Sequence, residues 1–89
     1  MNIRISDFGD FLVSRPAGKE AFMGAKAYIL NSVSPDDVFI LDFSGVKVLA
    51  PSWVDEFISG ITDTFSNKIE FVNTDNPSVN ASLHTVTIQ

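Results

Sequence analysis

The sequence has no cysteine, one histidine and no long hydrophobic run among its 89 residues. Without cysteine no disulfide can stabilise the chain, which fits a reducing compartment. A helix that spans a bilayer needs roughly 20 consecutive apolar residues, and no such run is present. Residues 1–5 also lack the basic-then-apolar order of a signal peptide, so we expect a soluble, cytoplasmic protein without membrane contact.

Basic residues are few. Six lysines and arginines stand against eleven acidic residues, which gives a formal charge of −5 and a pI near 4.4. Such a surface repels the phosphates of nucleic acids, so we expect no nucleic-acid partner. The acidic residues are scattered, and no cluster of His, Asp or Glu has the spacing of a metal site. We therefore predict no bound metal.

Motifs for catalysis and nucleotide binding are missing as well. A nucleophilic serine needs a base, and the one histidine, His84, is better explained as a partly exposed or hydrogen-bonded residue of a helix. The five glycines are isolated, and no G-x-x-x-x-G-K-[ST] phosphate-binding loop occurs. We expect neither enzymatic activity nor a cofactor.

The residues that are present favour one compact core. Hydrophobic residues make up 45% of the chain and include eight Phe, one Trp and one Tyr. A chain of this length buries roughly 60–65% of its unfolded surface, which is too little to divide between two cores. We predict a single domain over residues 1–89.

Hydrophobic patterning predicts alternating strands and helices. Residues 2–6 and 11–13 are expected to form an N-terminal hairpin around a turn at Phe8-Gly9-Asp10. The other predicted elements are a helix over 16–31 with Pro16 in its first turn, a central strand over 38–41 buried on both faces, an amphipathic helix through Val54, Phe57, Ile58, Ile61 and Phe65, a strand over 68–72 and a helix from Pro77 carrying Val79, Leu83 and Val86.

The element order is therefore β-β-α-β-α-β-α. Parallel neighbouring strands need helical crossovers, and this order supplies them. We predict an α/β fold with a mixed, mostly parallel sheet of about four strands and helices packed on it. Gly18, Gly24 and Gly60 fall inside helices, where close packing against the sheet would explain them, and Gly45 follows a strand at a turn that favours positive φ.

Ser52 is the main candidate for a functional residue. It precedes the amphipathic helix, and Asp55 follows three residues later, which matches the S-x-x-[DE] pattern of a helix cap. The unpaired N–H groups of a helix start also favour a phosphate. Two hypotheses stay open: Ser52 caps the helix, or its hydroxyl accepts a phosphoryl group.

Arg15 is a second candidate, because it is one of only two arginines. It follows Ser14 at the start of the first helix, where it is expected either to pair with Asp42 across the end of the sheet or to bind an anion. An enzyme or small-ligand site centred on Ser14, Arg15 and Asp42 is a further hypothesis.

Two motifs, the second made of two segments, resemble a STAS-like family of small bacterial and phage-encoded domains that is related to the anti-sigma factor antagonists. Residues 14–18, SRPAG, resemble the family's Ser-Arg-x-x-Ala opening with a one-residue offset. Residues 42–46, DFSGV, and 52–56, SWVDE, resemble its Asp-Phe-x-Gly-Val and Ser-Phe-x-x-Glu segments. Together with the element order, the resemblance covers about residues 2–86.

The resemblance implies a non-enzymatic protein–protein interaction module in signalling. In anti-sigma factor antagonists a partner kinase phosphorylates the second serine of an Asp-Ser-Ser-Gly loop. Ser52 takes that place here, while Ala50, Pro51 and Trp53 replace the other three residues. The implied partner is a kinase-like ATPase, and the implied partner-binding residues are Gly45, Lys47, Pro51, Ser52, Trp53, Asp55 and Glu56.

Two alternatives accompany this interpretation. Trp53 is either an exposed aromatic anchor for the partner or a residue folded beneath the first helix. The protein itself is either a phosphorylation-switched module or an oligomeric accessory subunit, in which an exposed sheet edge or helix face builds a homo-oligomer without switching.

Overall fold

The computed structural model describes residues 1–87, and its strands form two small sheets. The larger sheet has the order β1 (Asn2–Arg4), β3 (Phe39–Asp42), β5 (Ile69–Val72). The smaller sheet pairs β2 (Phe11–Leu12) with β4 (Val48–Leu49), a strand too short to be predicted. The α/β class is confirmed. The single mixed sheet is corrected to two sheets, and the strand pairs described are all parallel.

The prediction of an N-terminal hairpin is wrong, because β1 and β2 lie in different sheets. The chain leaves β1 through a 3-10 turn, η1 (Ile5–Phe8), in which Ile5 is fully buried. Gly9 then adopts a φ of +132° and redirects the chain. Ile3 and Ile5 thus share the core without sharing a strand, and polar–apolar alternation does not distinguish these two cases.

β3 is the central strand of the larger sheet, as its apolar sequence predicts. Phe39 and Leu41 are fully buried on one face of the strand. Ile40 and Asp42, on the opposite face, are only half-buried. The predicted burial therefore holds for one face and not for both.

α1 (Arg15–Tyr28) begins where Pro16 predicts a helix start. Ser14 is its N-cap residue, and the Ser14 hydroxyl accepts a hydrogen bond from the N–H of Ala17 at 3.2 Å. The α-helix ends at residue 28 rather than 31, because the chain tightens into a second 3-10 turn, η2 (Leu30–Ser32).

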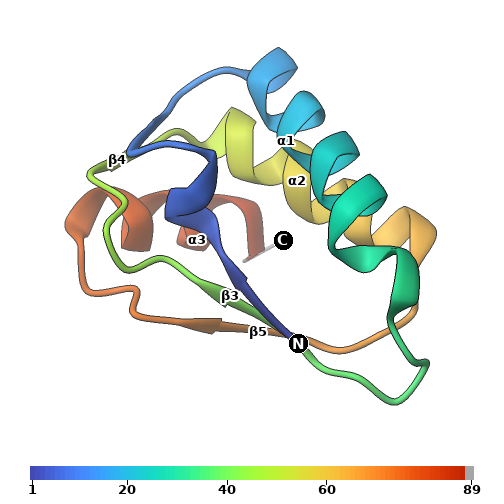
Figure 1. The fold of residues 1–89 in the computed structure, drawn as a ribbon. Coiled ribbons are helices and arrows are strands. Elements are labelled where there is room, and N and C mark those ends of the chain that lie inside the picture. The colour runs from blue at the N-terminus through green and yellow to red at the C-terminus, as the bar shows by residue number, and fades with distance from the viewer. Residues whose placement is uncertain (88–89) are drawn as a thin grey trace.

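α2 (Pro51–Thr64) is the predicted amphipathic helix, and it lies side by side with α1 (Figure 1). Glycines permit this approach. A Cβ at Gly18 would lie 2.4 Å from the backbone oxygen of Trp53, and one at Gly60 would lie 2.6 Å from a phenylalanine ring of α1. Close packing therefore explains Gly18 and Gly60, though against a helix and not the sheet, while Gly24 faces open space.

α3 (Pro77–Thr87) starts at the predicted residue and covers the outer edge of β4. Asn76 caps it, since its Oδ1 accepts the N–H of Ser78 at 2.7 Å. The Ser78 hydroxyl in turn accepts from the N–H of Leu49 and donates to its carbonyl, to which the Ser82 hydroxyl also donates. Side chains of α3 thereby satisfy the backbone N–H and C=O of Leu49 in β4.

Side chains from the helices and from both sheets form one hydrophobic core, whose largest fully buried members are Trp53, Phe39, Phe43 and Phe57. None of the helices within residues 1–87 is long and apolar enough to cross a membrane.

Candidate functional site

A shallow hollow of about 240 Å³ lies where α1 and α2 begin and α3 ends. It joins residues from three elements that are far apart in the sequence. We refer to it as the Ser52 hollow, and it is lined by Arg15, Pro51, Ser52, Asp55, Thr85 and Val86.

Ser52 is not the cap of α2, so the capping hypothesis is wrong. The N-cap residue is Ala50, which has no side chain that can cap, and Pro51 takes the first helical position. The N–H groups of Trp53 and Val54 both donate to the Ala50 carbonyl, at 3.2 and 3.3 Å. Ser52 is half-buried in the first turn, and within residues 1–87 its hydroxyl has no hydrogen-bond partner.

Arg15 pairs with α2 and not with Asp42, which corrects the predicted pair. Its Nη1 donates to Glu56 Oε2 at 2.8 Å and to Asp55 Oδ2 at 3.0 Å. The hydrogen bonds to Glu56 and then Asp55 raise the pKa of the guanidinium above its usual range. Because the cation is already shared between two carboxylates, it is a poor site for a free anion. The side chains are partly exposed, so solvent weakens the pairing.

Asp42 instead ties the ends of two strands together. Its Oδ1 accepts hydrogen bonds from Asn73 Nδ2 at 2.8 Å and from the N–H of Ser44 at 2.9 Å. These bonds, with Asn73 contributing most, lower the pKa of the Asp42 carboxyl below its ordinary 3.8. The carboxyl ends of parallel strands meet at one edge of a sheet, so Asp42 meets the residue that follows β5 and not the start of α1.

Trp53 is buried, with 1% of its surface exposed. Its ring stacks on Phe57 at a centroid distance of 5.3 Å, and its backbone lies against Gly18 of α1. The hypothesis of an exposed anchor is therefore wrong, and the alternative, in which Trp53 folds beneath the first helix, is confirmed.

The turn between β3 and β4 lies outside the Ser52 hollow. Gly45 has the predicted positive φ, at +86°, and is exposed. Lys47 is exposed and its Nζ lies 3.7 Å from Asp10 Oδ2. The predicted partner-binding residues therefore fall into two groups, with Gly45 and Lys47 separate from those of α2.

Thr85 and Val86 line the hollow but were not predicted as site residues. Neither has a motif, and only the packing of α3 brings them to the start of α2. His84, beside them in sequence, is exposed. Residues 1–87 contain no group of three or more His, Cys, Asp or Glu side chains that could hold a metal ion.

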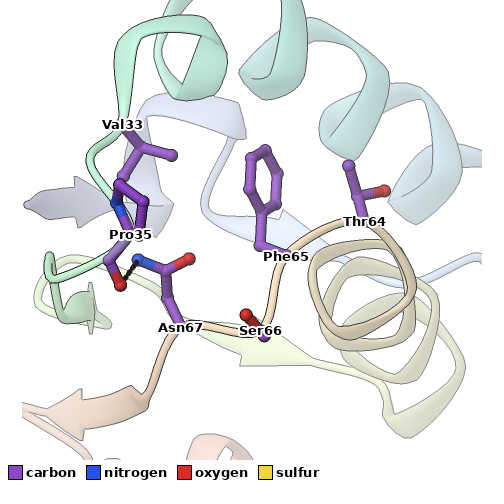
Figure 2. Close-up of a pocket in the computed structure, with 6 residues that line it drawn as sticks. All are labelled: Val33, Pro35, Thr64, Phe65, Ser66 and Asn67. Carbon is purple, nitrogen blue, oxygen red and sulfur yellow. Dashed lines mark hydrogen bonds between the residues drawn. The ribbon is translucent and has the colours of Figure 1, made fainter.

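A second hollow, of about 210 Å³, lies at the other end of α2 (Figure 2). Figure 2 shows Asn67 beside Pro35, with the Asn67 amide donating to the Pro35 carbonyl at 3.2 Å. The same amide nitrogen donates to the carbonyls of Ser34 and Asp37 at 2.9 and 2.7 Å. These bonds hold the turn before β3, so we assign this hollow a structural role.

Comparison with protein families gives one match. A family described as STAS-like domain of unknown function (DUF4325) matches residues 25–79, which is more than half of the chain. The match contains the 42–46 and 52–56 stretches, the last turn of α1 and all of α2, but not residues 14–18. Comparisons with curated proteins and with solved structures found no match.

Proposed function

Since this chain belongs to the STAS-like domain family of unknown function, we propose that it is a non-enzymatic module that binds a protein partner at the Ser52 hollow. Gly45 and Lys47, on the turn outside this hollow, are a second and separate contact in the proposal. Phosphorylation of Ser52 switches the binding, and a kinase-like ATPase is the class of partner that the resemblance to anti-sigma factor antagonists indicates.

One observation supports this proposal: the Ser52 hydroxyl makes no stabilising hydrogen bond within residues 1–87. It does not cap α2, it has no hydrogen-bond partner within residues 1–87, and it is partly accessible at the rim of a hollow. Serine is also a weaker helix former than alanine. Stability therefore gives no reason for a serine at this position.

The charges around Ser52 supply a mechanism for switching. Pro51 has no N–H, so the Ser52 N–H is the first donor of α2 and lies at the positive end of the helix dipole. A phosphate on Ser52, with about −1.5 to −2 charge, would attract Arg15 and repel Asp55 and Glu56. It would compete with both carboxylates for the one guanidinium. The surface would change charge and shape while the core beneath stayed packed.

The test compares what the wild-type protein and three folded variants bind in native lysate. Wild type, Ser52→Ala, Ser52→Asp and Ser66→Asp are immobilised, and captured proteins are identified by mass spectrometry. Ser66 is an exposed serine beyond the end of α2, so Ser66→Asp makes the same change away from the hollow. We expect one partner on wild type, Ser52→Ala and Ser66→Asp, and its loss from Ser52→Asp.

Stability must be measured beside binding. Asp in the first turn of a helix is favourable by about 0.3–1 kcal/mol. The free energy of unfolding of Ser52→Asp is therefore expected to lie within about 1 kcal/mol of the wild-type value. Equal capture by wild type and all three variants would show that Ser52 is not part of the binding surface. Intact-mass spectrometry of the protein isolated from its own cells then tests directly for a phosphate at Ser52.

A further inference from the structure

The outer edge of β2 is open. Within residues 1–87, β2 pairs with β4 and with no other strand. N–H groups of the β4 segment donate to the carbonyls of Asp10 and Leu12, so these carbonyls face β4. Because the backbone groups of successive residues in an extended strand point to opposite sides, the N–H and C=O groups of Phe11 and Val13 point away from β4.

Two apolar side chains accompany these open backbone groups. Phe11 is 62% exposed and Val13 is 55% exposed, whereas Leu12 between them is buried. Side chains two residues apart lie on the same face of a strand. Phe11 of β2 and Val13, the residue after β2, therefore present an aromatic and a β-branched side chain on one face. Their backbone donors and acceptors have no partner within residues 1–87.

The other strand edges are protected, which sets β2 apart. Side chains of α3 bond the backbone of Leu49 and so cover β4. β1 and β5 place the exposed charges of Arg4 and Glu70 at the two margins of the larger sheet. Charges and coverings of this kind are the usual means of keeping a strand edge from pairing. β2 has neither.

We propose that β2 pairs with β2 of a second copy of this chain, antiparallel and about a two-fold axis at Leu12. This register sets Phe11 of each copy opposite Val13 of the other, with the N–H and C=O of one bonding the C=O and N–H of the other. An aromatic side chain opposite a β-branched one is a favourable cross-strand pair. Asp10 falls opposite the uncharged Ser14, so no like charges face each other.

The spacing of Phe11 and Val13 about Leu12 makes the edge complementary to itself, and this favours a second copy as its occupant. The contact is small, however, because two exposed side chains per copy bury far less than the roughly 800 Å² per partner of a stable interface. The charge of −5 on each copy adds repulsion. We therefore expect a dissociation constant on the order of 0.1–1 mM.

Sedimentation equilibrium of the full chain from about 10 μM to about 1 mM tests the pairing over the expected range of affinity. We expect wild type to shift from monomer toward dimer. Phe11→Lys is expected to weaken the dimer at least tenfold, since a charge on an edge opposes pairing. Val13→Pro, which removes an N–H without a hydrogen-bond partner among residues 1–87, is expected to do the same. Met23→Lys is the matched control, because Met23 is 56% exposed on α1.

Amide hydrogen exchange measured over the same concentrations locates the contact. The amides of Phe11 and Val13 are expected to gain protection as the concentration rises, while that of Leu12, bonded to β4, is protected throughout. A protein that stays monomeric at about 1 mM overturns the proposal. So does a dimer that Met23→Lys weakens as much as Phe11→Lys, or one that leaves both amides unprotected. The β2 edge is not part of the Ser52 hollow, so the two proposals fail separately.

Discussion

At Gly18 a single missing methyl group allows α1 to lie against α2. An added Cβ would meet backbone atoms of Trp53, which cannot rotate away as a side chain can. We expect Gly18→Ala to destabilise the protein by about 1–3 kcal/mol, the usual range for overpacking. The measurement is chemical unfolding followed by circular dichroism.

Gly24 provides the control for this prediction, because it lies on the same helix with open space around its Cα. Gly24→Ala relieves the helix of a glycine and is expected to raise stability by about 0.5–1 kcal/mol. If both variants changed stability alike, the close approach of α2 at Gly18 would not explain the destabilisation by Gly18→Ala.

Single residues also show where sequence patterns compete. Residues 52–55 match a capping pattern, but Pro51 is favoured at the first position of a helix and moves the cap back to Ala50. Arg15 could form an ion pair whether it lay beside the end of the sheet or beside α2. The sequence offers Asp42, Asp55 and Glu56 alike, and only the packing of α1 along α2 selects the last two.

At the scale of elements, Asn76 joins α3 to the segment before β4. Its Oδ1 caps the helix, and its Nδ2 donates to the carbonyls of Val46 and Lys47 at 3.3 and 3.1 Å. We expect Asn76→Ala to lower the free energy of unfolding by about 1–2 kcal/mol, the upper part of the range for a lost cap.

Two further variants separate the roles of Asn76. Asn76→Asp keeps a capping oxygen but loses the amide donor, so its loss of stability should be smaller than that of Asn76→Ala. Asn80→Ala, on an exposed residue of the same helix, should change stability by no more than about 0.5 kcal/mol. Equal losses of stability for Asn76→Ala and Asn76→Asp would show that the capping oxygen contributes nothing.

Elements long enough to show a repeated hydrophobic pattern were predictable, and elements of two residues were not. α1, α2 and α3 each carry several apolar residues at helical spacing, and each was found close to its predicted start. β2 and β4 have two residues each, which is too few for a pattern. Their pairing depends on chain segments more than 30 residues apart, so no local signal specifies it.

For the whole molecule, the prediction of one domain has a direct test. Trp53 is the single tryptophan, and it is buried at the contact of both long helices with the core. If the chain is one cooperative unit, Trp53 fluorescence and far-ultraviolet circular dichroism should report the same unfolding midpoint. Two separate midpoints would contradict the single domain.

The sequence by itself determined the α/β class, the three helices, the central strand and the positive φ of Gly45, because each depends on local periodicity or local backbone sterics. The tertiary structure alone decided that the strands form two parallel sheets, that Trp53 is buried, and that Arg15 pairs with Asp55 and Glu56. Those outcomes depend on which surfaces meet across the folded chain, and many pairings of similar residues are compatible with the same local pattern.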